Sequence, residues 1–184
     1  MLVRGAKKHG RAPVWYEFAV SRGAMCQLGR CTIDTDPLFS GLDTMHCTIN
    51  WLPETGMAFS AETGSGHLLT MDGAPDGGGR NLAPRPMETL LAGAGGCTAY
   101  DVVLILKRGR HDVTGCQVKA TAERAHEDPK VFTKLHLHFS VSGRALPPVA
   151  VERAIALSHE KYCSATVMIG KTAEVTTSFE VLEA

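Results

Sequence analysis

The fold depends on RPMETLLAGAGGCTAYDVVLILKR, residues 85–108, which is the longest helical pattern in the sequence. Pro86 suits the first turn of a helix, where a backbone N–H has no helical partner. Gly93, Gly95 and Gly96 each cost about 1 kcal/mol relative to alanine in a helix, so their presence needs a reason. Glycines let another backbone approach closely. We therefore expect a central, crowded helix that packs against a second subunit.

A helical wheel places Cys97 on the apolar side of this helix. When each residue advances by 100°, the glycines fall on the flanks and back of an apolar stripe about 120° wide. The stripe contains Met87, Leu90, Leu91, Ala94, Cys97, Thr98 and Ile105. Two interpretations of Cys97 stay open at this point: a small hydrophobic residue that fills a tight core, or a group with a chemical task.

Alternating apolar and polar residues on both sides of the helix predict strands. The strands expected are residues 46–52, 57–63, 66–72, 116–122, 134–142 and 172–183. A second helix, opened by Pro147-Pro148 and reaching Tyr162, separates the last two. Because each strand has one polar face, we expect antiparallel sheets that helices cover on one side only. This is an α+β fold.

Composition and charge bound the class of protein. The 184 residues are 44% hydrophobic and 21% charged, which is typical of a globular domain. Nineteen basic and nineteen acidic residues cancel, so we expect no nucleic-acid partner, which would need a basic surface. We find no apolar run near 20 residues and no signal-peptide pattern, so we expect no membrane association. Six cysteines are too sparse for a disulfide scaffold, which favours a cytoplasmic location.

The pattern of the chain changes near residue 45. Residues 1–44 show no sustained periodicity, whereas order begins at Met45. We interpret 1–44 as a weakly ordered or atypical N-terminal extension, with Met45 as the candidate functional start, and 45–184 as the domain. The alternative is an ordinary N-terminal segment that packs on the domain.

The other cysteines receive different interpretations. Cys163 lies in EKYCSAT, toward the end of the second predicted helix. Two cysteines on helices that share one core can meet, although the sequence supplies no distance. Cys47 and Cys116 lie on the core faces of predicted strands, and we interpret them as packing residues.

Two further patterns suggest ligands only weakly. His136 and His138 lie two apart on one strand face, a spacing that can hold a metal, but no third ligand lies beside them. The run DGGGRN, residues 76–81, fits neither common phosphate-binding glycine motif. We therefore expect no metal at the histidines and an ordinary loop at 74–86.

Three stretches together resemble the OsmC/Ohr family, and within it the branch of YhfA-like proteins. They are RPMETLLAGAGGCTAYDVVLILKR, HEDPKVFTKLHLHFSVSG and VERAIALSHEKYCSATVMI. The resemblance runs from Met45 to Ala184. It implies an obligate homodimer of two intertwined chains, with long helices at the centre, a sheet wrapped outside, and two active sites at the dimer interface.

The resemblance also implies a chemistry and its residues. Cys97 matches the cysteine that reduces an organic or lipid hydroperoxide, and Cys163 the one that resolves the resulting sulfenic acid into a disulfide. A dithiol, lipoyl groups among the candidates, would reset the pair, with no metal or organic cofactor. An arginine oriented by a glutamate holds the thiolate in such proteins. Arg80 or Arg85 matches the arginine, and Glu88 the glutamate.

This sequence departs from the family pattern at the glutamate. Met87 occupies the position directly after Pro86, so the acid is displaced by one residue, or 100° of helix, to Glu88. Asp101 lies one turn beyond Cys97, where an ionised carboxylate would raise the thiol pKa. The alternative to a peroxidase is a non-catalytic relative that binds lipids or small molecules or senses redox state. A third alternative is a structural dimer whose cysteines only pack.

Overall fold

The computed structural model describes residues 44–184, so the predicted extension 1–44 lies, except for Thr44, outside the described residues. The helices and strands follow one another as β1 (Cys47–Leu52), β2 (Ala58–Thr63), β3 (Leu68–Met71), α1 (Pro86–Arg108), β4 (Asp112–Arg124), β5 (Phe132–Arg144), α2 (Pro148–Leu157), α3 (Ser164–Ile169) and β6 (Glu174–Glu183). Every strand and both helices expected from periodicity are present, and the α+β class is confirmed.

The strands form two separate sheets of three. β1, β2 and β3 make an antiparallel meander, and the second sheet has the order β4-β5-β6. Within it β4 and β5 are antiparallel, but β5 and β6 are parallel. The prediction of purely antiparallel sheets was therefore wrong for β6. Because α2 and α3 carry the chain back along the sheet before β6 begins, β6 runs in the same direction as β5.

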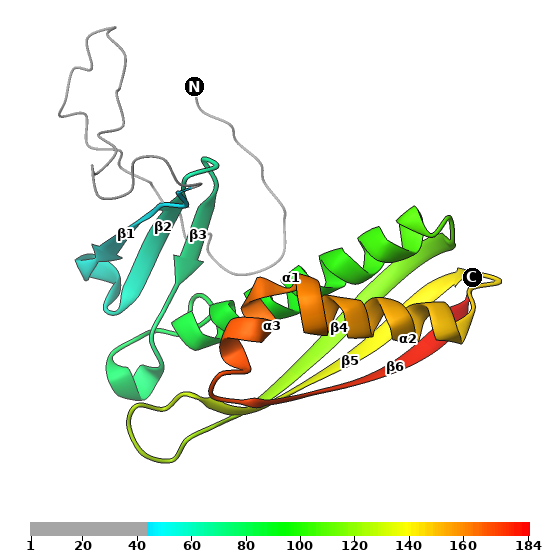
Figure 1. Cartoon of the computed structure of the whole chain (residues 1–184). Coiled ribbons are helices and arrows are strands. Elements are labelled where there is room, and N and C mark those ends of the chain that lie inside the picture. The colour runs from blue at the N-terminus through cyan, green and yellow to red at the C-terminus, as the bar shows by residue number, and fades with distance from the viewer. Residues whose placement is uncertain (1–43) are drawn as a thin grey trace, which may run out of the picture. The chain divides into compact units, whose positions relative to one another are not determined.

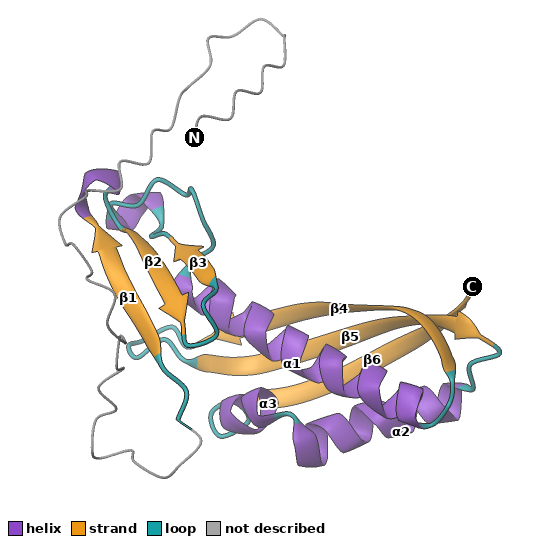
Figure 2. Cartoon of the chain, turned by 90° about the horizontal axis from the view of Figure 1, so that it is seen from above, coloured by secondary structure: helices purple, strands orange, loops and turns teal. Residues whose placement is uncertain are grey.

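The helices cover one face of the β4-β5-β6 sheet, as Figures 1 and 2 show. Alternate residues of β5 point toward the helices and are fully buried, from Leu135 to Val141. Val102 of α1 and Val151 of α2 complete the same core. The other face of the sheet is polar, which agrees with the alternation in the sequence. The core of the domain therefore lies between the helices and the apolar face of this sheet.

The buried side of α1 differs from the predicted stripe. Its buried residues are Ala94, Gly95, Thr98, Val102 and Leu106. A Cβ at Gly95 would lie 3.9 Å from that of Ala120 on β4, an ordinary contact. Leu90 is 48% exposed and Cys97 is half-buried, so placing Cys97 in the middle of the core-facing stripe was wrong. Tertiary packing turns the helix so that Cys97 lies on the flank nearest the C-terminal helices.

α1 is also long and apolar enough to cross a membrane by length and composition, with a mean hydropathy of 1.6 over its most apolar 18 residues. The expectation that no such segment exists was wrong in that respect. The helix nevertheless packs on β4 and against α2 and α3. Such packing is typical of the core helix of a globular domain. Within the described chain, 28% of these 18 residues are buried.

The loop before α1 is organised around one buried carboxylate. Asp72 accepts hydrogen bonds from the backbone N–H groups of Gly73, Arg80 and Leu82, at 2.7, 3.0 and 2.9 Å. These donors, Leu82 first, hold the pKa of Asp72 below its ordinary value, although burial opposes them. The glycine run is thus a closed loop around a carboxylate.

Candidate functional site

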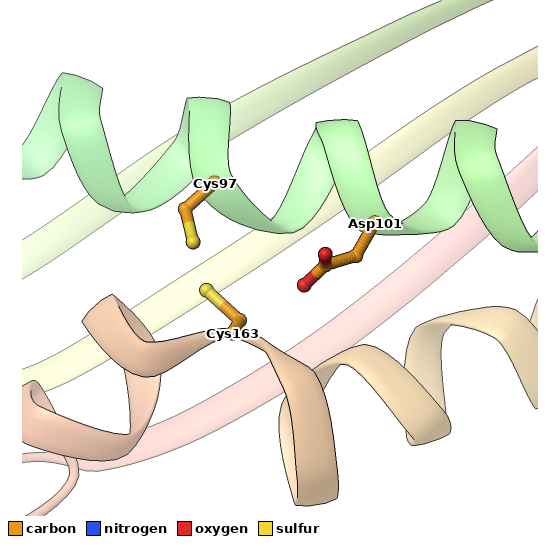
Figure 3. Close-up of side chains that lie close together, drawn as sticks. All are labelled: Cys97, Asp101 and Cys163. Carbon is orange, nitrogen blue, oxygen red and sulfur yellow. The ribbon is translucent and has the colours of Figure 1, made fainter. Parts of the chain in front are cut away.

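Two cysteines and an aspartate from distant parts of the chain meet on the flank of α1. The sulfur atoms of Cys97 and Cys163 and a carboxylate oxygen of Asp101 all lie within 4.8 Å of one another. Figure 3 shows Cys97 and Asp101 projecting from α1 toward Cys163 on the facing segment. The structure therefore brings together the two cysteines that the sequence singled out.

The helical repeat of α1 places Cys97 and Asp101 on one side. Residues four apart lie one above the other on a helix surface, so both side chains face the same neighbour. Cys97 is half-buried, so part of this residue is open to solvent.

A π-helical turn delivers Cys163 to this place. The second predicted helix keeps α-helical geometry only to Leu157 and continues as the π-helical turn η4, Ser158–Tyr162. The N–H of Cys163 donates to the carbonyl of Ser158 at 2.8 Å, which is the wide spacing of a π-turn. Cys163 then precedes α3 and is fully buried. The extra residue in the turn aims the Cys163 sulfur at α1.

A chain of buried hydroxyl groups orients Asp101. The Ser158 hydroxyl donates to Asp101 Oδ2 at 3.0 Å and lies 2.9 Å from the Thr98 hydroxyl. Since Ser158 has one proton and gives it to Asp101, Thr98 must donate to Ser158. Both protons therefore point toward the carboxylate. This arrangement fixes one oxygen of Asp101, and no hydrogen bond from residues 44–184 engages the other.

The environment of Cys97 favours its neutral thiol. Burial raises the pKa of Cys97, and the hydrogen bond with Cys163 and the charge of Asp101 raise it further. The backbone N–H of Ala165, in the first turn of α3, acts in the opposite direction by donating to the sulfur. In the chain alone the balance lies with the protonated form, so a reaction that uses the thiolate must first remove a proton.

An apolar cavity adjoins the site. A hollow of about 520 Å³ has Ala165, the donor to Cys97, in its wall. Most of its lining is apolar and comes from α1, the β4–β5 hairpin and α3, including Leu90, Phe132, Met168 and Ile169. Arg124 and Lys130 lie in the same lining. An apolar wall with a few polar groups is typical of a site for a small organic ligand.

The arginine and glutamate proposed for the thiolate are placed elsewhere within this chain. Glu88 accepts the N–H of Arg85 at 2.9 Å and so caps the start of α1. Nine residues of helix separate it from Cys97, about 13 Å along the axis. The Arg80 guanidinium donates to the carbonyl of Glu54 at 3.2 Å. Their roles toward Cys97 therefore stay predictions that a single chain leaves untested.

The remaining candidate residues serve the sheets. The rings of His136 and His138 bond the hydroxyls of Thr176 and Ser178 on β6 at 2.8 to 2.9 Å. Within residues 44–184, the one group of three His, Cys, Asp or Glu side chains close enough to share a metal is that of Cys97, Asp101 and Cys163.

Of the two strand cysteines, the core position predicted for one was wrong. Cys116 is half-buried, its pKa raised by burial, and it packs against the core. Cys47 is exposed on β1, a strand whose residues are exposed throughout. Alternation predicts which face of the sheet a residue lies on, but it does not predict whether that face is covered. Within the described residues, both faces of β1 are exposed.

The hydroxyl chain is the part of the site that the sequence did not indicate. Thr98 appeared in it only as a member of the helical stripe, and Ser158 only as part of the second predicted helix. A polar residue on the buried side of each of two helices was the available signal, because buried hydroxyls need partners. Their sequence separation of 60 residues hid the pairing.

Known proteins match this chain over the region of the site. A family model described as OsmC-like protein matches residues 77–178. The protein YhfA of Escherichia coli K12 is 48% identical over 140 residues, which make up 76% of this chain and 100% of YhfA. The name YhfA states no activity.

Solved structures share the fold. A hypothetical protein from Aquifex aeolicus VF5 is 26% identical with a TM-score of 0.67, over 78% of this chain and 99% of its own. An organic hydroperoxide resistance protein, OsmC, from Legionella pneumophila is 18% identical with a TM-score of 0.57, over 76% and 98%. At 18% identity the likeness shows the fold alone.

Proposed function

The chain belongs to the OsmC-like protein family, and from this premise we propose that it is a thiol peroxidase that reduces organic hydroperoxides. The observation that carries the proposal is the pair of Cys97 and Cys163, from α1 and the start of α3, whose sulfur atoms lie within 4.8 Å of each other. Two thiols this close can form a disulfide after a small adjustment of the side chains. A structural relative that shares the fold is named as an organic hydroperoxide resistance protein.

The difference in burial supports one division of roles between the two cysteines. Cys97 is half-buried, and Cys163 is fully buried. The Cys97 sulfur attacks the peroxide and becomes a sulfenic acid, while the peroxide leaves as an alcohol. Cys163 then attacks the oxidised sulfur, so that a disulfide forms and water leaves. A dithiol reductant, with lipoyl groups among the candidates, restores both thiols by exchange.

The cavity of about 520 Å³ favours an organic peroxide over hydrogen peroxide. Its wall includes Ala165, whose N–H contacts the Cys97 sulfur, so an apolar tail bound there would bring its peroxide group to the thiol. Burial of each methylene group contributes about 0.8 kcal/mol to binding. A peroxide with a long tail should therefore have a lower KM than a short one.

We also propose that the functional unit is a homodimer with α1 at its centre. Leu90 and Tyr100 on α1 are 48% and 68% exposed, and Trp51 on β1 is 55% exposed. Large apolar side chains in such numbers on one chain are typical of a surface that a partner covers. A Cβ atom built on Gly93 or Gly96 would meet no other part of the described chain within 4 Å, which leaves room for a second backbone. Light scattering should give twice the mass of the chain, and a monomer at micromolar concentration would refute the dimer.

The cation that stabilises the Cys97 thiolate is proposed to be Arg80 or Arg85, with Glu88 as its partner. The raised pKa of Cys97 in the single chain creates the need for such a group. We further propose a cytoplasmic location, because the four described cysteines are free, as they are in reducing compartments.

The test is turnover of cumene hydroperoxide with a dithiol reductant, measured for three cysteine variants. Cys97→Ser should abolish turnover. Cys163→Ser should stop after one turnover and leave a sulfenic acid on Cys97 that dimedone labels. Cys116→Ser is the matched control, since this half-buried thiol lies on β4 away from the pair. Full turnover by Cys97→Ser would refute the proposal.

A second function has support from the same cavity. An apolar hollow near the Cys97 thiol, whose pKa is raised, also suits a protein that binds a lipid and senses oxidation without turning over. Native mass spectrometry of the purified protein separates the two functions. Retained lipid together with no peroxide turnover would favour the binding protein.

A further inference from the structure

Asp101 is a carboxylate placed beside two thiols without a basic partner. None of the ion pairs among residues 44–184 involves it. It is half-buried, and two hydroxyls in series hold it in place. Since a carboxylate next to thiols raises the pKa of Cys97, its charge alone would slow a peroxidase. Two buried hydroxyls nevertheless hold the Asp101 carboxylate beside the thiols, so we expect its charge to serve a role there.

The task can be found in the protons of the proposed reaction. Each half of the peroxidase cycle starts from a neutral thiol and releases an oxygen anion, so one proton must move from sulfur to oxygen each time. We propose that Asp101 carries these protons, taking each from a thiol and giving it to the leaving oxygen. This assignment rests on the proposed function. It gives the reaction a third residue, Asp101, whose role in proton transfer differs from the roles of Cys97 and Cys163.

In the first half-reaction the Cys97 sulfur attacks the distal peroxide oxygen. The S–O bond forms and the O–O bond breaks, so sulfur is oxidised and the peroxide is reduced. The thiol proton passes to Asp101, and from Asp101 to the leaving alkoxide, which becomes the alcohol. The hydrogen of the hydroperoxide stays on the sulfenic oxygen, and Asp101 ends as it began.

In the second half-reaction the Cys163 sulfur attacks the sulfenic sulfur of Cys97. The S–S bond forms and the S–O bond breaks. The proton of Cys163 passes to Asp101 and then to the departing hydroxide, which leaves as water. A single carboxylate serves both steps because it lies within 4.8 Å of both sulfur atoms.

The geometry suits proton transfer to both sulfurs. Ser158 donates to Oδ2 and so fixes the carboxylate, and no hydrogen bond from the described residues engages the other oxygen. Figure 3 shows the carboxylate turned from α1 toward the space beside the two sulfurs. A separation of up to 4.8 Å is spanned by one water molecule. Hydrogen bonds of this kind often shorten only when the substrate binds.

The surroundings of Asp101 are mixed. Cys97 faces it from the same helix, and Cys163 and Ser158 face it from across. On another side of α1, β4 presents the apolar side chains of Val118 and Ala120 near Gly95. The two thiols are therefore the titratable partners that the proposal uses.

Asp101→Asn separates proton transfer from simple electrostatics because the two predict opposite signs. The amide can still accept the Ser158 hydrogen bond, so the fold should be kept. Loss of the charge lowers the pKa of Cys97 and should speed its alkylation by iodoacetamide at pH 7. If Asp101 carries protons, oxidation of Cys97 by cumene hydroperoxide should nevertheless slow by roughly a hundredfold, the lower end for a lost acid–base group.

Two further variants complete the experiment. Asp101→Glu keeps a carboxylate and should recover at least part of the lost rate. Asp112→Asn, at an exposed site at the start of β4, is the control and should match the unmodified protein. The readouts are stopped-flow rates of sulfenic acid and of disulfide formation, alongside alkylation rates over a series of pH values.

The outcomes are distinct. Slow oxidation combined with fast alkylation in Asp101→Asn supports the proposal. Oxidation at or above the original rate in that variant overturns it while leaving the peroxidase intact, and so does an Asp101→Glu variant as slow as Asp101→Asn. Absence of any turnover that depends on Cys97 in the unmodified protein defeats the proposed function, and this assignment falls with it.

Discussion

Replacement of Ser158 by alanine should lower the free energy of unfolding by about 3 kcal/mol, because it weakens the contact between α1 and η4. The Ser158 hydroxyl is fully buried and connects Thr98 to Asp101. A hydrogen bond to a charged group contributes about 2 kcal/mol, and a buried hydroxyl left without a partner costs about 1 kcal/mol more. Alanine removes the first and leaves Thr98 without its acceptor.

Urea unfolding at pH 7 and a fixed protein concentration measures this loss. With a slope of about 2 kcal/mol per molar urea, the midpoint should fall by about 1.5 M. Ser164→Ala is the matched control, because this serine is exposed at the start of α3 and its replacement should change stability by less than about 0.5 kcal/mol.

A double variant tests the origin of the effect. Thr98→Val removes the hydroxyl that Ser158→Ala strands, so the pair should cost about 1 kcal/mol less than the sum of the single variants. Additive losses, or a loss below about 1 kcal/mol for Ser158→Ala alone, would show that the hydroxyl chain does not exist in solution.

Two predictions concern the loop before α1. Asp72→Asn should lower the melting temperature at pH 7. Because the folded pKa of Asp72 lies below its ordinary value of 3.8, its stabilisation is present above that value and is lost as pH falls through the folded pKa. Melting curves at pH 7 and pH 3 should thus show the difference shrinking in acid, and a constant difference would contradict the role of the N–H donors. Gly79→Ala should cost about 2 kcal/mol, since its Cβ would overlap the backbone carbonyl of Gly73, whereas Gly77→Ala, with nothing within 4 Å, should be neutral.

Periodicity determined the order and type of the elements but not the direction of β6. Polar alternation over residues 172–183 predicts a strand with one wet face, and the structure has β6 at Glu174–Glu183. Alternation is the same for a strand with a parallel neighbour and one with an antiparallel neighbour. It therefore led to the wrong direction of β6 relative to β5. The helical pattern that starts at Pro147 was the better guide, because a helix between neighbouring strands usually returns the chain to the same end of the sheet.

The sequence also placed Cys97 on the correct helix and the wrong part of its face. The wheel weighs apolar residues equally, whereas the sheet accepts the side with Ala94, Gly95 and Thr98, where α1 can approach β4 closely. That rotation leaves Cys97 half-buried instead of enclosed. Leu90 and Tyr100 are exposed in the single chain. The sequence pattern does not distinguish an apolar residue that a partner chain covers from one in the core of its own chain.

The sequence by itself determined the α+β class, the family and the two cysteines, because these depend on local periodicity and on motifs that are continuous along the chain. Only the tertiary structure decided which groups meet at Cys97. The π-turn at Ser158–Tyr162 aims Cys163 at α1, and the Ser158 hydroxyl reaches Asp101 across 57 residues of sequence. Contacts of this kind depend on how two helices pack on one sheet, and no local pattern encodes that distance. The Asp101 carboxylate raises the pKa of Cys97, and it is also the group that we propose carries the protons in both half-reactions.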